Sequence, residues 1–259
     1  MEIHLLGDDW TAVGHSVGWE ELIPLGFGLL ALAALAVLFV RAIIVRRRYR
    51  ALGMLSKENI QALREQVASL ERETTGEVAI VVLEESDAHP QGCLLAAIVG
   101  MVAAATVASA DPRAAQASIL VPALALGGAA GYFTARWLPH FRRRFVSTRR
   151  ADEMVEEQAL QEFSRLGMHR TEGRTGVLIL ISLFERAVIV LADEGVHVKG
   201  GAEAWVDANR RILEGVRNGS LAKGLRDGIE SVGQVLRVHC PRGQRLENEL
   251  PDHIVIRHR

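Results

Sequence analysis

Three long apolar runs alternate with polar stretches along this chain. They cover residues 22–40, 90–110 and 114–135, and none contains Asp, Glu, Lys, Arg or His. Each run is close to the ~20 residues with which a helix crosses ~30 Å of hydrocarbon. A core helix of that length in a soluble domain normally keeps a polar face, which these runs lack. The pattern predicts three membrane spans, at 22–45, 90–110 and 114–138.

The second and third spans are expected to form a transmembrane hairpin, because only the polar turn 111–113 separates them. Small residues recur at a spacing of four in both arms, with Gly127 and Gly131 facing Gly100 and Ala104. Such spacing lets two helices approach closely in a membrane, although Ala and Gly are also common in spans. We expect the two arms to pack against each other.

Arginines follow the first and third apolar runs, whereas residues 1–21 contain neither Lys nor Arg. Because cytoplasmic ends of spans collect these residues, we expect residues 1–21 outside a bacterial inner membrane and the soluble part in the cytoplasm. Arginines near anionic headgroups are favoured by about 1 kcal/mol each, so membrane lipids are expected partners. The expected headgroup contacts are Arg46, Arg47, Arg48, Arg142, Arg143 and Arg144. A protein partner for these clusters is the alternative.

The soluble part reads as alternating helices and strands. Ile60, Leu63, Val67 and Leu70 recur at helical spacing after Ser56, a suitable N-cap, and predict a helix over 57–74. The β-branched run 77–83 predicts a buried strand. Beyond the hairpin the pattern predicts a helix ending near Gly167, an antiparallel strand pair and two more helices, at 154–166, 176–182, 186–192, 205–216 and 221–236.

The order of elements predicts an α/β sandwich, in which a small sheet carries helices on both faces because its strands are apolar throughout. A hairpin that crosses twice returns the chain to the side it left, so the segments before and after it can build one domain. The expected organisation is an extracytoplasmic segment 1–21, three spans, a domain in two parts, 56–89 and 150–241, and a polar tail 242–259 ending in a short edge strand.

Composition narrows the functional classes. The chain has 259 residues and a net charge of −1, which gives no reason to expect nucleic acid as a partner. Its two cysteines predict no disulfide framework in the cytoplasm, and no zinc-ligand spacing occurs. The acidic stretch 84–89 is interpreted as a solvated linker.

Several short motifs, in their order along the chain, resemble the TPM domain, which is also named for a thylakoid-lumen phosphatase and photosystem II repair proteins. They are the Thr75-Gly76-Glu77 entry to the first strand, Phe163 to Gly167, Gly176-Val177-Leu178, and the helix around Gly224 to Ile229. The chain is more similar to the bacterial membrane-protein branch of that family, over residues 56–241 without the hairpin. The segments that carry this likeness are Arg174 to Leu178, Asp193 to Gly195, Trp205, and Leu236 to Pro241.

The resemblance implies an α/β sandwich and, for some members, divalent-metal binding with weak phosphatase activity. The catalytic branches place an Asp-Asn pair before Gly-Val-Leu, where this chain has Arg174 and Thr175. A guanidinium there would repel a cation such as Ca²⁺ or Mg²⁺, which needs oxygen ligands. Glu77, Asp193 and Glu194 remain the candidate metal ligands, but surface carboxylates at strand ends are ordinary solubilising residues.

No nucleophile with an adjacent base and no phosphate-binding loop is evident in the sequence. We therefore expect no catalytic residue and no cofactor, with Ca²⁺ or Mg²⁺ as the alternative. The expected function is a non-catalytic interaction or assembly module, an accessory subunit of a membrane complex that binds a membrane-protein partner or a second copy. The alternative is a divalent-metal-dependent, phosphatase-like hydrolase.

Overall fold

The computed structural model describes residues 55–109, 116–196, 203–242 and 254–257. The expected extracytoplasmic segment 1–21, the expected span 22–45 and the first arginine cluster, Arg46 to Arg48, lie outside the described residues. Two described helices are long and apolar enough to cross a membrane, and they correspond to the second and third apolar runs.

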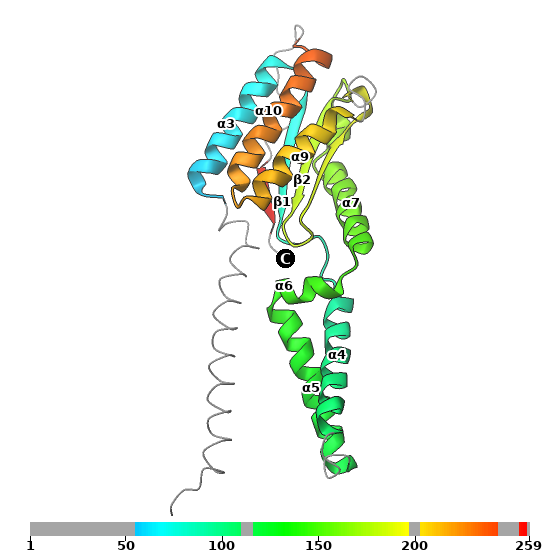
Figure 1. The fold of residues 1–259 in the computed structure, drawn as a ribbon. Helices are drawn as coiled ribbons and strands as arrows, with labels where there is room; N and C mark the ends of the chain where they lie inside the picture. The colour runs from blue at the N-terminus through cyan, green and yellow to red at the C-terminus, as the bar shows by residue number, and fades with distance from the viewer. Residues whose placement is uncertain (1–54, 110–115, 197–202, 243–253, 258–259) are drawn as a thin grey trace, which may run out of the picture. The chain divides into compact units, whose positions relative to one another are not determined.

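A four-stranded mixed sheet lies at the centre of the domain (Figure 1). Its order is β3-β2-β1-β4, with β1 (Glu77–Leu83) parallel to β2 (Gly176–Ser182) and to β4 (Ile254–Arg257). Strand β3 (Ala187–Ala192) pairs antiparallel with β2, so the expected strand pair is confirmed. Every residue of β1 and β2 is buried, as expected for central strands covered on both faces.

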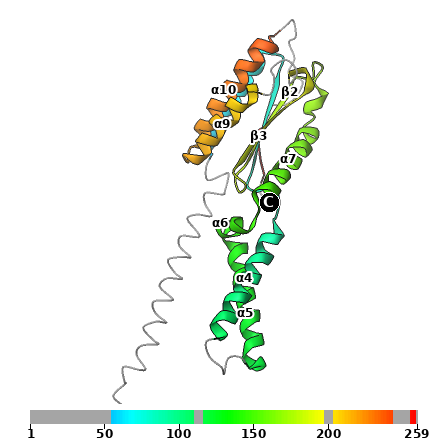
Figure 2. The same ribbon diagram turned by 45° about the vertical axis from the view of Figure 1, so that its right-hand side comes forward.

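Helices cover both faces of the sheet, as the sequence predicts. One face packs on α3 (Lys57–Glu73), α9 (Glu203–Arg217) and α10 (Leu221–His239), and the other on α7 (Thr148–Arg165). Figures 1 and 2 show these two layers on opposite sides of the strands. Alternate residues of β1 and β2 enter the two cores, and each fully buried Val, Ile or Leu contributes about 1.5–3 kcal/mol.

Local signals place the helix ends where the sequence indicates. The Ser56 hydroxyl accepts a hydrogen bond from the Asn59 backbone N–H at 3.2 Å, which caps α3. Helix α7 ends at Arg165, and Gly167 follows with a φ of 73°. That left-handed conformation favours glycine, which has no Cβ to clash with the following carbonyl.

The domain extends to residue 257, beyond the boundary at 241 expected from the sequence. Strand β4 completes the sheet beside β1, so the end of the tail is an edge strand of the domain itself. The buried Glu162 carboxylate on α7 holds this strand, since its Oε1 lies 3.0 Å from Arg257 Nε and 3.3 Å from Arg165 Nη1. The expected short edge strand at the end of the tail is thus confirmed, although it has only four residues.

Helices α4 (Pro90–Ala108) and α5 (Ala117–Trp137) form the expected hairpin. A Cβ on Gly100 would lie 2.1 Å from the Gly127 carbonyl oxygen, and one on Gly131 would lie 2.2 Å from the Ala96 carbonyl oxygen. No side chain fits at such distances, so the expected close packing of small residues between the two arms is confirmed. The short helices α6 (Pro139–Arg142) and η1 (Arg143–Phe145) follow α5.

Helices α9 and α10 are joined by close backbone contact and by one carboxylate. A Cβ on Gly215 would lie 2.3 Å from Gly224 Cα. Asp207 of α9 accepts a hydrogen bond from the Ser231 hydroxyl of α10 at 2.9 Å and from Arg211 Nε at 2.6 Å. Arg211, then Arg210 and Ser231, lower the pKa of Asp207 to about 2.

The pKa of Asp207 can be measured directly by carboxyl ¹³C NMR during an acid titration. We expect a midpoint near 2, below the roughly 3.9 of an unfolded chain, because hydrogen bonds favour the charged form. The carboxylate thus contributes stability above about pH 3.9 that is lost as the pH falls through about 2. Arg211→Gln should raise the midpoint, and an unchanged midpoint in this variant would contradict the assignment to Arg211.

Candidate functional site

The carboxyl edge of the sheet is where open α/β folds commonly bind ligands. In this protein the parallel strands β1 and β2 both end there, and two connecting segments follow them, residues 84–89 and 183–186. The first leads into the hairpin and the second into β3. Polar side chains of both segments meet at this edge and form a connected cluster.

Glu185 is the centre of this carboxyl-edge cluster. Its side chain is fully buried, and Oε1 lies 2.6 Å from His89 Nε2 and 3.1 Å from the Ser86 backbone N–H nitrogen. The Ser182 hydroxyl donates to Oε2. One carboxylate therefore joins the end of β2 to the residues that follow β1 and precede α4.

The order of these contacts does not suit nucleophilic catalysis. A serine nucleophile needs the imidazole next to its hydroxyl, with a carboxylate behind the imidazole. Here the Glu185 carboxylate lies between Ser182 and His89, and all three residues are buried. The cluster can hold the polypeptide in place, but it offers no attacking group to a substrate.

Arg142, at the end of α6 and just after the hairpin, lies at the same edge of the sheet. Its guanidinium pairs with Glu85, donates to the Ala88 carbonyl at 3.1 Å, and lies 4.4 Å from the centre of the Phe184 ring. The His89 ring also stacks on the Phe184 ring, with a distance of 5.3 Å between the ring centroids. The entry and the exit of the hairpin are thereby fastened to the sheet.

This position corrects two expectations. Arg142 is 4% exposed, so it is not available to a lipid headgroup as the sequence suggested, and Arg143 donates to the Phe184 carbonyl at 2.5 Å. Arg144 is exposed, and its headgroup contact stays a prediction. The stretch 84–89 is not a solvated linker, since Ser86 and His89 are buried and Glu85 is bound by Arg142.

The candidate metal ligands lie at the opposite edge, where β1 and β2 begin. Asp193 is buried, and Arg174 Nη2 lies 3.2 Å from its Oδ1, while Arg174 Nη1 donates to Glu194 at 2.6 Å. Glu77 and Asp193 lie on either side of Gly176. Glu77 is the residue of β1 that pairs with Gly176 in the sheet, and the Asp193 backbone N–H donates a hydrogen bond to the Gly176 carbonyl.

Arg174 therefore forms ion pairs with both acidic residues that follow β3, Asp193 and Glu194. Its own backbone has a φ of 51°, and the guanidinium neutralises charge that a cation would need. Within residues 55–109, 116–196, 203–242 and 254–257, no group of three His, Cys, Asp or Glu side chains is placed to hold a metal ion. Glu77, Asp193 and Glu194 do not converge as one ligand set there.

Sequence reasoning missed Glu185, which lies within the short connection between β2 and β3, and Ser182, which is the last residue of β2. Their partners are distant along the chain, and only the parallel register of β1 and β2 brings them together. A signal was present in hindsight at His89, a polar residue that directly precedes the proline opening an apolar run.

Comparison with known proteins gives one distant structural similarity. No family model and no curated protein matches the sequence. Among solved structures, the chain is similar to the NMR structure of BA42 protein from the psychrophilic bacterium Bizionia argentinensis. The two are 17% identical, the match covers 78% of this chain and 94% of that chain, and the TM-score is 0.49.

Replacing Glu185 tests the structural role of the cluster. We expect Glu185→Gln to lower the free energy of unfolding by about 3 kcal/mol, because it removes the charged acceptor that several buried donors share. Urea unfolding of the full chain in mild detergent, followed by circular dichroism, measures this value. Glu153→Gln is the matched control, since Glu153 forms an exposed pair with Arg149 and should change stability by less than about 0.5 kcal/mol. Equal effects of the two substitutions would contradict the role of Glu185.

Proposed function

We propose that this protein is a membrane-anchored, non-catalytic interaction or assembly module of a bacterial inner membrane. The surface of the α4–α5 hairpin carries the proposal. Large apolar side chains are exposed along both helices, which a soluble protein rarely tolerates over such an area. They include Leu94, Leu95, Ile98, Val102, Val107, Val121, Leu126 and Phe133.

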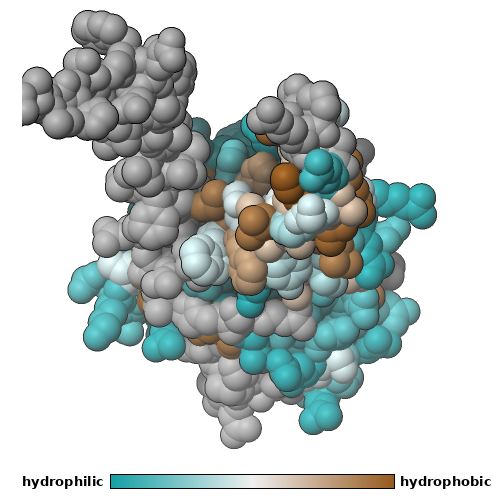
Figure 3. Space-filling model, turned by 90° about the horizontal axis from the view of Figure 1, so that it is seen from below, coloured by the Kyte–Doolittle hydropathy of each residue, from teal (hydrophilic) through white to brown (hydrophobic). Residues whose placement is uncertain are grey.

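A bilayer explains this surface better than a protein core. Only 22% of the apolar stretch of α4 and 6% of that of α5 is buried, whereas a core helix of a soluble protein would be mostly covered. Figure 3 looks onto the hairpin and shows apolar side chains gathered there, with hydrophilic side chains around them. Tyr132, Phe133 and Trp137 are exposed near the end of α5, where aromatic rings favour the headgroup layer.

The polar groups at both ends of the strands bind one another, which supports a non-catalytic role. The residues after β1 and β2 bind one another and the base of the hairpin, and Arg174 binds the acids at the opposite edge. What remains accessible is the surface of a rigid α/β domain held at a membrane. We infer that this surface serves a membrane-protein partner or a second copy, in keeping with the bacterial membrane branch of TPM-like domains that the sequence resembles.

The proposed topology places the hairpin turn outside and the sheet in the cytoplasm. Ser109→Cys, at the end of α4, should react with a membrane-impermeant maleimide in intact cells. Arg217→Cys, at the exposed end of α9, should react only after the cells are opened. The wild type is the control, because Cys93 and Cys240 are buried. Labelling of Arg217→Cys in intact cells would contradict the proposed topology and favour the opposite orientation.

Extraction from the native membrane in gentle detergent, followed by native mass spectrometry, tests the assembly role. We expect a complex of fixed stoichiometry, with either another membrane protein or further copies of this chain. A monomer that hydrolyses a phosphomonoester faster with Mg²⁺ or Ca²⁺ would contradict the proposal and favour the metal-dependent hydrolase. Glu77, Asp193 and Glu194 would then be the ligands to substitute.

A further inference from the structure

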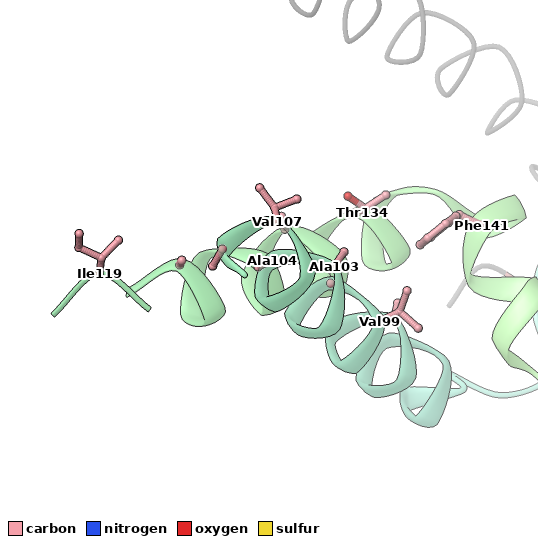
Figure 4. Close-up of a pocket in the computed structure, with 14 residues that line it drawn as sticks. Val99, Ala103, Ala104, Val107, Ile119, Thr134 and Phe141 are labelled. Carbon is pink, nitrogen blue, oxygen red and sulfur yellow. The ribbon is translucent and has the colours of Figure 1, made fainter. Parts of the chain in front are cut away.

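A groove runs along one face of the α4–α5 hairpin. Side chains from α4, α5 and α6 line an open depression of about 750 Å³, a volume comparable to that of sites that bind small ligands, about 300–1,000 Å³. Figure 4 shows Ile119 at one end of the groove and Thr134 with Phe141 at the other. The lining is otherwise Ala, Gly and Val, so the groove offers van der Waals contact and almost no hydrogen bonding.

The groove is longer than the hydrocarbon layer of one leaflet of a bilayer. From Ile119 to Thr134 the α5 helix rises about 22 Å, at about 1.5 Å per residue. One leaflet contributes about half of the ~30 Å hydrocarbon thickness, so an extended acyl chain fits within the groove. Gly100, Gly127 and Gly131 form the close contact between the two arms and also line the groove, so the groove follows the line where the two helices meet.

An exposed arginine, Arg144, lies just beyond the end of the groove that Phe141 marks. Arg144 follows Phe141 by three residues in the short helical segment α6–η1, a spacing that puts both side chains on one side of that segment. Arg144 is exposed, and in the part of the chain that the structure describes no acid or carbonyl binds its guanidinium. Its neighbours differ, since Arg142 is bound by Glu85 and Arg143 by the Phe184 carbonyl.

We propose that this groove binds one anionic phospholipid, with an acyl chain along the small side chains and the headgroup phosphate on Arg144. The proposal rests on the membrane anchoring proposed above, and it names the lipid class and the residue that recognises it. An arginine guanidinium and a phosphate form charge-assisted, bidentate hydrogen bonds, which a zwitterionic headgroup weakens by its own positive charge. Trp137 is exposed in the last turn of α5, and an indole ring favours the headgroup layer that the proposal places there.

The full chain in nanodiscs of equal phosphatidylcholine and phosphatidylglycerol provides the test. After release into mild detergent, native mass spectrometry counts the lipids that remain bound. We expect one retained phosphatidylglycerol per chain in the wild type. Arg144→Gln should reduce the ratio of phosphatidylglycerol to phosphatidylcholine about fivefold, equivalent to about 1 kcal/mol. Ala130→Leu, which fills the groove from an exposed position, should reduce retention of both lipids.

Two substitutions serve as matched controls. Ala129→Leu adds the same side chain at the neighbouring exposed position, which does not line the groove, and Arg217→Gln removes an exposed arginine on α9. Both should retain lipid as the wild type does. Equal retention by Arg144→Gln and Arg217→Gln, or by Ala130→Leu and Ala129→Leu, overturns the proposal.

A lipid-free dimer that Ala130→Leu dissociates also overturns it and assigns the groove to a second copy. A wild-type chain that does not enter nanodiscs at all refutes the anchoring itself, which separates that failure from the loss of the lipid site.

Discussion

The fold depends on one constraint, which is that a chain leaving the sheet after β1 must come back to the same edge after the hairpin. The Glu185 carboxylate and the Arg142 guanidinium meet this constraint. Glu185 binds the segment that enters the hairpin, and Arg142, at its exit, binds Glu85 in that same segment. Because these charged groups are buried, the loss of one leaves its partner with an unpaired buried charge, which destabilises the fold. The contacts that join the hairpin to the sheet are therefore expected to form together.

The same geometry explains why the usual ligand position of an α/β sheet is filled here by the protein. At the carboxyl edge the space is taken by Phe184, His89 and the arginine that lies on the Phe184 ring. At the opposite edge a single guanidinium binds both acids that follow β3. At both edges, charged side chains thus join segments of the chain that are distant in sequence.

Regular features of the fold could be predicted from sequence because they depend on local pattern. The helical spacing of Leu63, Val67 and Leu70 and the apolar run of β1 each specify an element without reference to its neighbours. The facing glycines of the hairpin were also evident, since both arms show the same spacing. The candidate site was not predictable in this way. Glu185 and Arg142 are ordinary in sequence, and their roles follow from partners that lie 96 and 57 residues away.

The position of β1 between β2 and β4 also sets an order of events during synthesis. Both neighbours of β1 lie after the hairpin in sequence, so the strand leaves the ribosome with no sheet partner. Until the hairpin and the following residues are made, the six apolar residues that follow Glu77 in β1 are an exposed β-prone segment of the kind that aggregates. The nascent chain therefore has to protect β1, whether by α3, by a chaperone or by the nearby membrane, before the sheet can close around it.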